Sequence, residues 1–282
     1  MSALGAARSD LDAVEAIVRA AGTSFHRGMA ILPADRRHAM YAIYAFCRIV
    51  DDIVDEPGAL AAKRAELDRW RARIAALYAG VADDLPVSRI LLRAIRAYGL
   101  RQEDFVAVID GMQMDGETDI IAPSLAALDL YCDRVASAVG RLSVRAFGDG
   151  SPQADVVAHH LGRALQLTNV LRDIAEDAGR NRVYLPREFF SRPPASAKEA
   201  LADPLLPEIC CRMTLMAHHH FHAAAAAMDS CDRRAMRPAR LMGATYAAIL
   251  RHLEKRGWQR LDEPVKLAKW EKLWLLLRFG LR

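Results

Sequence analysis

The sequence lacks the features that mark membrane-spanning, disulfide-stabilised and secreted proteins. No uncharged apolar run reaches the roughly 18 residues that a membrane-spanning helix needs. The five cysteines are an odd number and form no CxxC pair, so a disulfide framework is not expected. The polar N-terminal stretch, with Arg8 and Asp10, does not resemble a secretory signal. We therefore expect a cytoplasmic protein whose cysteines act as small buried apolar residues.

Strand signals are also scarce. Alternation of β-branched and polar residues is nearly absent, and few dipeptides typical of hairpins occur. Apolar residues instead recur every three or four positions, as they do on the buried faces of helices. The sequence therefore predicts an all-α fold in a single domain over residues 1–282. The expected helices cover residues 10–21, 34–56, 60–80, 86–98, 102–114, 125–148, 153–178, 204–229, 233–256 and 265–278.

The charge distribution argues against a nucleic-acid-binding protein. Lysine and arginine total 39 against 35 acidic residues, which gives a net charge of +4, and the basic residues are spread along the chain. A nucleic-acid interface normally concentrates its basic residues in a patch. We expect a mild preference for anionic partners and no nucleic acid.

The predicted helix over 34–56 is apolar around most of its circumference, which favours burial, yet one face is polar. Asp51 and Asp55 lie one turn apart on this face. Their repulsion is costly in a cleft of low dielectric constant, and a bound cation would remove it. Asp52 lies toward the edge of the face, so we expect a supporting role for it. The residues of this polar face are Tyr41, Tyr44, Arg48, Asp51, Asp52 and Asp55.

A second predicted helix repeats the pattern. Between residues 161 and 177, Gln166, Asn169, Asp173 and Asp177 share a face, and Leu, Val and Ile cover another. Carboxylate and amide oxygens suit Mg²⁺, which commonly joins a few carboxylates to a substrate phosphate. Neither polar face contains His or Cys, which argues against zinc. One acidic pair alone is usually a solvated helix face or a capping cluster, but two in-phase pairs favour a ligand site.

Two acidic pairs facing each other across a helical bundle predict a specific chemistry. Mg²⁺ ions and a diphosphate ester would fit between them, and the apolar helix faces below would hold a hydrocarbon tail. Ionisation of an allylic diphosphate suits such a cleft, because metal ions stabilise the developing charge of the leaving group. A third DxxxD, Asp115 with Asp119, is interrupted by Gly116, and helix termination is its simpler interpretation.

At these segments the chain resembles the squalene/phytoene synthase family, the head-to-head prenyltransferases. TSFHRGMAILPADRRHAMYAIYAFCRIVDDIVDE, residues 23–56, is similar to the first aspartate block of the family. ALQLTNVLRDIAEDAGRNRVYLP, residues 164–186, is similar to the second. The GTSF start and the tail after residue 257 are most similar to the family members of the bacterial hopanoid pathway that make presqualene diphosphate.

The resemblance implies an isoprenoid-synthase helical bundle around a central cavity and an enzyme of the transferase class. Two farnesyl diphosphates would condense to presqualene diphosphate and diphosphate, with two to three Mg²⁺ ions and without NADPH. The implied metal ligands are Asp51, Asp55, Asn169, Asp173 and Asp177, and the implied catalytic residues add Arg48 and Tyr44. The implied substrate contacts are Ser24, Phe25, Tyr41, Arg48, Arg134, Gln166, Asn169, Arg182 and Tyr246.

One position departs from part of the family. Squalene synthases have Tyr just before Val-Ala in the segment that here reads YCDRVASAVG, whereas this chain has Arg134, as phytoene synthases do. The departure disfavours full conversion to squalene. Arg134 is interpreted either as a contact to the second diphosphate or as an ion pair to a nearby carboxylate. The alternatives that stay open are an NADPH-dependent squalene synthase, a phytoene or dehydrosqualene synthase, and a non-catalytic relative that acts as an assembly factor.

The tail at about 265–282 is basic and amphipathic. Its apolar residues Trp270, Leu273, Trp274 and Leu277 share one helical face, with Lys266, Lys269, Lys272 and Arg278 nearby. This pattern suits a peripheral contact with the inner face of the membrane, and it equally suits a terminal helix docked on the bundle. Pathway enzymes that act on presqualene diphosphate are further potential partners.

Overall fold

The computed structural model describes residues 5–21, 29–117 and 120–280. These residues are helical with connecting turns, and among them only an isolated bridge between Ile121 and Val183 is of β type. The prediction of an all-α fold is confirmed. Ser24, Phe25 and Asp119 lie outside the described residues.

The long helices match the predicted ones closely, with ends that differ by a few residues. The elements are α1 (Arg8–Ala20), α3 (Ala34–Asp55), α4 (Leu60–Tyr78), α5 (Pro86–Tyr98), α6 (Gln102–Glu117), α7 (Leu125–Cys132), the π-helix η1 (Asp133–Ser137), α8 (Ala138–Phe147), α9 (Pro152–Gly179), the 3₁₀-helix η2 (Arg187–Phe189), α10 (Ala197–Leu201), α11 (Leu206–Met228), α12 (Arg237–Arg256), α13 (Lys269–Leu275) and the π-helix η3 (Leu276–Gly280).

Local sequence signals set several of these boundaries. The Ser151 hydroxyl accepts a hydrogen bond of 3.2 Å from the amide of Ala154 and caps α9, and Pro152 occupies the first turn. Gly148, with φ of 99°, ends α8 in the left-handed conformation that side chains other than glycine rarely adopt. These signals make a tight reversal between α8 and α9, so the two helices run antiparallel.

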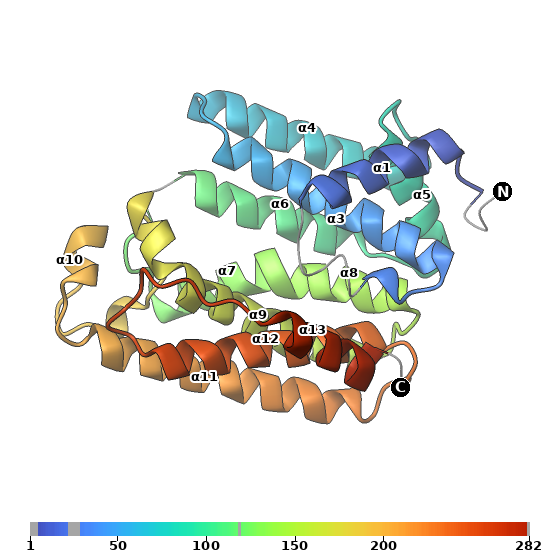
Figure 1. Ribbon diagram of the computed structural model, residues 1–282. Coiled ribbons are helices and arrows are strands. Elements are labelled where there is room, and N and C mark those ends of the chain that lie inside the picture. Colours follow the sequence, from blue (N-terminus) through green and yellow to red (C-terminus); the bar gives the residue numbers. More distant parts are fainter. Residues whose placement is uncertain (1–4, 22–28, 118–119, 281–282) are drawn as a thin grey trace.

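The helices form layers around α8 and α9. In Figure 1, α1, α3, α4, α5 and α6 lie above, α7, α8 and α9 cross the middle, and α11, α12 and α13 lie below. α3 packs against α1, α5, α6 and α8, while α9 packs against α8, α11 and α12. The helices that carry the two polar faces, α3 and α9, therefore both pack on α8.

α9 approaches η1 and α8 closely because glycines stand at the contacts. A Cβ atom on Gly162 would lie 2.6 Å from Cα of Ser137, and one on Gly140 would lie 3.1 Å from Cβ of Ala158. Such distances leave no room for a side chain. The glycines therefore set how closely α9 packs on η1 and α8.

Four histidines meet where α9 packs on α11. His159 and His160 of α9 face His219 and His220 of α11, and Nδ1 of His160 lies 2.9 Å from Nδ1 of His220. Burial, together with the charges of His160 and Arg163, lowers the pKa of His220 to about 4. His220 is therefore neutral at pH 7.

Within the described residues, no helix is both long enough and apolar enough to cross a membrane.

Candidate active site

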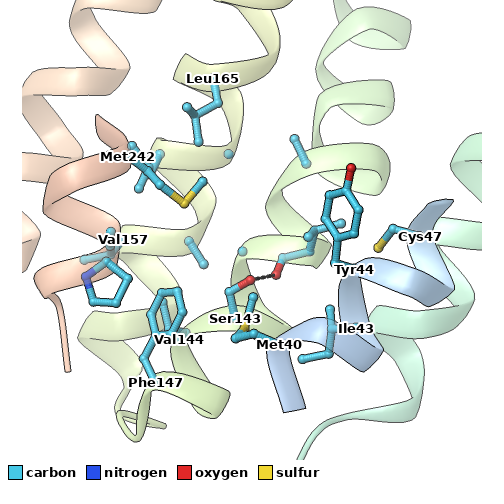
Figure 2. Close-up of a pocket in the computed structure, with 18 of the residues that line it drawn as sticks. Met40, Ile43, Tyr44, Cys47, Ser143, Val144, Phe147, Val157, Leu165 and Met242 are labelled. Carbon is cyan, nitrogen blue, oxygen red and sulfur yellow. Dashed lines mark hydrogen bonds between the residues drawn. The ribbon is translucent and has the colours of Figure 1, made fainter. Parts of the chain in front are cut away.

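The polar faces of α3 and α9 meet at one end of a cavity of about 250 Å³. Its walls come from α3, η1, α8, α9 and α12, and most of the lining side chains are apolar (Figure 2). The hydroxyl of Ser143 donates to the carbonyl oxygen of Val139 at 2.7 Å and so presents little polarity to the interior. The other polar side chains of the lining are Tyr44, Gln166 and Asn169.

The order of residues along the helices gives the cavity two chemically distinct ends. On α9 the lining runs from Val157 to Asn169, and Asp173 and Asp177 follow on the next two turns. On α3 it ends at Cys47, and Asp51 and Asp55 follow. Phe147, at the end of α8, lines the opposite end beside the start of α9. The cavity therefore has an acidic end and an apolar end.

The carboxylates of α3 are only partly neutralised by the protein. Arg48 lies 2.5 Å from Asp52 but 3.4 Å from Asp51. Burial, followed by the charge of Asp55, raises the pKa of Asp51 to about 6. A carboxyl group with a raised pKa is one whose negative charge lacks a sufficient partner. Asp52 is thus the main partner of Arg48 in this structure, and its supporting role stays a prediction.

The two carboxylates on α9, Asp173 and Asp177, differ in how far the protein neutralises them. Arg172 donates to both oxygens of Asp173, at 2.8 and 2.6 Å, through its Nε and Nη2. Asp177 has no such clamp, and burial followed by the charge of Asp173 raises its pKa to about 7, although Arg182 opposes the shift. Sequence reasoning did not single out Arg172, because a basic residue next to an aspartate gives no indication of which way either side chain points.

A basic segment after α9 links the two helices. Nη1 of Arg182 lies 3.5 Å from Oδ1 of Asp55, and Nη1 of Arg180 lies 3.8 Å from Oδ2 of Asp55. Asn181, between them, has a φ of 56°, a left-handed conformation that Asn tolerates well. This turn folds the two guanidinium groups back over the acidic end.

Asp115 of α6 joins the acidic end as a buried residue. It accepts hydrogen bonds of 2.8 Å from the hydroxyls of Tyr131 and Tyr184, whose rings stack with centroids 5.1 Å apart. Burial raises its pKa, and its charge in turn contributes to the raised pKa values of Asp51 and Asp177. α6 passes through Gly116 and ends at Glu117, so the helix does terminate within this segment, one residue after the glycine.

Gly116 also packs closely against α3. A Cβ atom there would lie 3.0 Å from Cγ1 of Val54 on α3.

Sequence reasoning missed Tyr131 and Tyr184, although both stand in segments that it considered. Their common partner, Asp115, comes from a third part of the chain.

The donor atoms at the acidic end fit Mg²⁺. Among the described residues, no group of three or more His, Cys, Asp or Glu side chains is placed to hold a metal ion by itself. The side chains at hand offer oxygen atoms, and Oδ1 of Asn169 is buried without a hydrogen-bond partner. Mg²⁺ takes one or two protein carboxylates and fills its other positions with water and phosphate oxygens. The unpartnered Oδ1 and the two carboxyl groups with raised pKa values match that requirement.

The remaining predicted residues lie at varying distances from this end. Tyr246 of α12 is buried, and its hydroxyl interacts with Arg172 and Asn169 beside the second acidic pair. Tyr41 is buried toward α1, near Glu15 and Arg19, and is not part of the cavity lining. Its role in binding substrate stays a prediction.

Arg134 lies in the π-helix η1, whose next two residues line the cavity. Its Nη2 is 4.0 Å from Oδ2 of Asp110, while Arg71 holds the other oxygen of Asp110 at 2.6 Å. The ion pair that sequence reasoning considered therefore exists, but it is long. The positive charge of Arg134 is correspondingly little compensated.

Comparison with known proteins places the chain in a family. The family model for squalene/phytoene synthases matches residues 18–271, so the chain belongs to that family. It is similar to the presqualene diphosphate synthase of Rhodopseudomonas palustris, with 48% identity over 93% of this chain and 94% of the relative. The presqualene diphosphate synthase of Zymomonas mobilis is 46% identical over 95% and 92% of the two chains. A dehydrosqualene synthase crystallised with a ligand superimposes with a TM-score of 0.84, at 25% identity, over 96% of this chain and 95% of that one.

Proposed function

We propose that this chain condenses two farnesyl diphosphates head to head into presqualene diphosphate and diphosphate. The observation that carries the proposal is that Asp51 and Asp55 on α3, and Asp173 and Asp177 on α9, directly follow the cavity-lining residues of their helices, with Arg182 after α9 paired to Asp55. Relatives of about half-identical sequence bear the name of this activity. The resemblance of the two aspartate blocks supports the same reaction.

The reaction begins when the C1–O bond of one farnesyl diphosphate breaks and the electron pair leaves with the diphosphate. The allylic cation is attacked by the 2,3 double bond of the second farnesyl diphosphate. Loss of a proton then closes the cyclopropane ring, and the second diphosphate is retained. The π electrons of the second substrate form the first new bond, and the electrons of the C1–H bond that loses its proton in the first substrate close the ring, so no reductant is needed.

The side chains at the acidic end have separate tasks. Asp51, Asp55, Asn169, Asp173 and Asp177 would hold Mg²⁺, which supplies positive charge to stabilise the departing diphosphate. Arg48 and Arg182 are placed to bind diphosphate oxygens, and Tyr44 and Gln166 stand where the polar end meets the apolar lining.

The apolar part of the cavity has a task of its own. Its lining of Ile, Val, Leu, Met and Phe side chains excludes water and holds the prenyl chains. A dry site prevents water from trapping the cation.

The finer part of the proposal is that the reaction stops at the cyclopropyl diphosphate. Arg134 directly precedes the cavity-lining Val135, and its charge is compensated only by a long ion pair to Asp110, which supports a contact with the retained diphosphate. A retained diphosphate needs such a cation. NADPH is not part of this reaction.

Product identification tests the proposal. The purified chain is incubated with farnesyl diphosphate and Mg²⁺, with and without NADPH, and the products are analysed by mass spectrometry. A C30 diphosphate in both reactions, and none with EDTA, is the expected result. Squalene in the NADPH reaction would favour the alternative of a squalene synthase, and C40 product from geranylgeranyl diphosphate would favour a phytoene synthase.

A further inference from the structure

The C-terminal helix docks on the bundle through only one of its faces. Leu275 is buried, and Leu276 and Phe279 pack against the core. Glu271 has a partner on each oxygen: Oε1 lies 2.9 Å from Nε2 of His252 on α12, and Oε2 accepts a hydrogen bond from the amide of Ala268. Figure 1 shows α13 lying along α12 near the C-terminus. Docking on the bundle, one of the two interpretations of the tail, is therefore what the structure shows for this face.

The opposite face of the same helix is exposed and apolar. Trp270 is 71% exposed, Leu273 57%, Trp274 56% and Leu277 51%. These four residues, here named the tail face, follow one another at helical spacing along α13 and η3. Large apolar side chains gathered in this way on a protein surface usually mark an interaction site.

Basic side chains flank the tail face. Residues 266–280 contain four basic residues, Lys266, Lys269, Lys272 and Arg278, against one acidic residue, Glu271. Within the part of the chain that the structure describes, the three lysines and Arg278 form no ion pair. Glu271 is turned inward to His252 and to the helix start. The exposed charge beside the tail face is therefore positive.

We infer that the tail face binds the interface of an anionic lipid bilayer. Tryptophan and leucine side chains at the depth of the headgroups, with lysines on the flanks, are the chemistry of helices that lie in a membrane surface. Lysine stems extend along the apolar boundary while their amines reach lipid phosphates. Anionic headgroups complement the positive flank, whereas a neutral apolar partner would leave those four charges without counterions.

The location of the tail gives this contact a use. α13 and η3 pack on α12, and α12 contributes Pro238, Ala239 and Met242 to the wall of the cavity. A bilayer on the tail face would thus lie beside a helix that lines the cavity. If the proposed function holds, the C30 product is a lipid that such a bilayer can accept, but bilayer binding itself does not depend on the reaction.

Cosedimentation of the full chain with vesicles tests the inference. Vesicles of equal parts phosphatidylglycerol and phosphatidylcholine are compared with vesicles of phosphatidylcholine alone. We expect binding to the anionic vesicles that weakens as salt is raised. Replacement of Trp270 and Trp274 by Ser should weaken binding by more than about tenfold, because their apolar burial in the bilayer is lost.

Two matched variants separate the tail face from general surface properties. Leu215→Ser removes an apolar side chain that is 69% exposed on α11 and should leave vesicle binding unchanged. Lys269→Glu should weaken binding by about tenfold, whereas Lys198→Glu on α10 should have little effect. Turnover of farnesyl diphosphate dispersed in detergent is measured on every variant, so that loss of the reaction is distinguished from loss of bilayer binding.

Three results would overturn the inference. The chain could fail to bind anionic vesicles, or the tryptophan double variant could bind as well as the unmodified chain. The third is concentration-dependent dimerisation that the double variant abolishes, without lipid binding, since it would assign the tail face to a second copy of the chain.

Discussion

At the scale of single residues, the acidic end is a site whose charge the protein leaves unbalanced. Asp51 and Asp177 have raised pKa values because each is partly buried and lies next to another carboxylate. The sequence could predict the two pairs, since their spacing is local. It could not predict that Arg172 clamps Asp173 or that two tyrosines hold Asp115, because these contacts depend on side-chain direction and on distant segments.

Replacing Asp51 by Asn should stabilise the metal-free chain while it abolishes turnover. The amide removes a charge that the fold disfavours, and the half-exposed position limits the gain to about 1 kcal/mol. Urea unfolding at pH 7.5 in EDTA measures the gain. A destabilised variant would contradict the view that this carboxylate is uncompensated. Asp12→Asn, on an exposed position of α1, is the control.

His220 should make stability sensitive to mild acid. Its pKa is about 4 in the folded chain and near 6.5 in the unfolded chain, so the unfolded state binds more protons between these values. The contribution of neutral His220 to the free energy of unfolding is complete above pH 6.5, and it falls as the pH drops toward 4. The neighbouring groups on both helices also lower the pKa of His220. They are Arg163, His159 and His160 on α9 and His219 on α11.

A comparison with His220→Gln isolates this effect. Between pH 7.5 and pH 5, the unmodified chain should lose about 1 kcal/mol more than the variant, after allowance for the partial exposure of His220. Urea unfolding at the two pH values measures it. Identical pH dependence in the two proteins would show that His220 is not held neutral by the α9–α11 contact.

At the scale of elements, helix positions followed from local sequence, whereas their ends and contacts did not. α3 and α9 were predicted nearly to the residue, because proline, serine and glycine mark their boundaries. The short α10 and η2 lie between the expected helices over 153–178 and 204–229, where no helix was predicted. The predicted helix over 125–148 contains the π-helix η1, whose extra turn width depends on packing against Gly111 and Gly162.

Gly162→Ala should destabilise the chain by about 2 kcal/mol or more, because the new methyl group would overlap the backbone of Ser137 at 2.6 Å. Gly179→Ala is the matched control in the same helix. Nothing lies within 4 Å of its added Cβ, so this change should be neutral or stabilise by up to about 1 kcal/mol. Thermal unfolding distinguishes the two, and equal effects would contradict the close contact between α9 and η1.

Phe147 should limit the length of the prenyl chain, because it stands at the apolar end of the cavity, away from the aspartates. Phe147→Ala should raise turnover of geranylgeranyl diphosphate relative to farnesyl diphosphate. Leu142→Ala, also buried on α8 but outside the lining, should cost stability, on the order of 2–5 kcal/mol, without a change in this ratio. An unchanged ratio in both variants would place the length limit elsewhere.

At the scale of the whole molecule, the fold brings two helices far apart in sequence to one end of one cavity. The prediction that two acidic pairs face a common space rested on their matching pattern. The cavity lining reaches Cys47 on α3 and Asn169 on α9, each one turn before the first aspartate of its pair, and the shared space itself stays a prediction. The sequence could not decide whether the tail docks or faces outward. The structure shows that it docks through Leu275 while Trp270 and Trp274 stay exposed, since one amphipathic helix has two faces.

The most direct test of the central claim is the rate at which farnesyl diphosphate is consumed with Mg²⁺ by chains that lack one acidic pair. Asp51→Asn with Asp55→Asn, and separately Asp173→Asn with Asp177→Asn, are compared with the exposed control Asp12→Asn with Asp262→Asn. Either acidic-pair variant should lose at least about a hundredfold in turnover while it stays folded, and the control should keep its rate. Turnover that survives the loss of either pair would contradict the claim that both hold the metal ions for diphosphate departure.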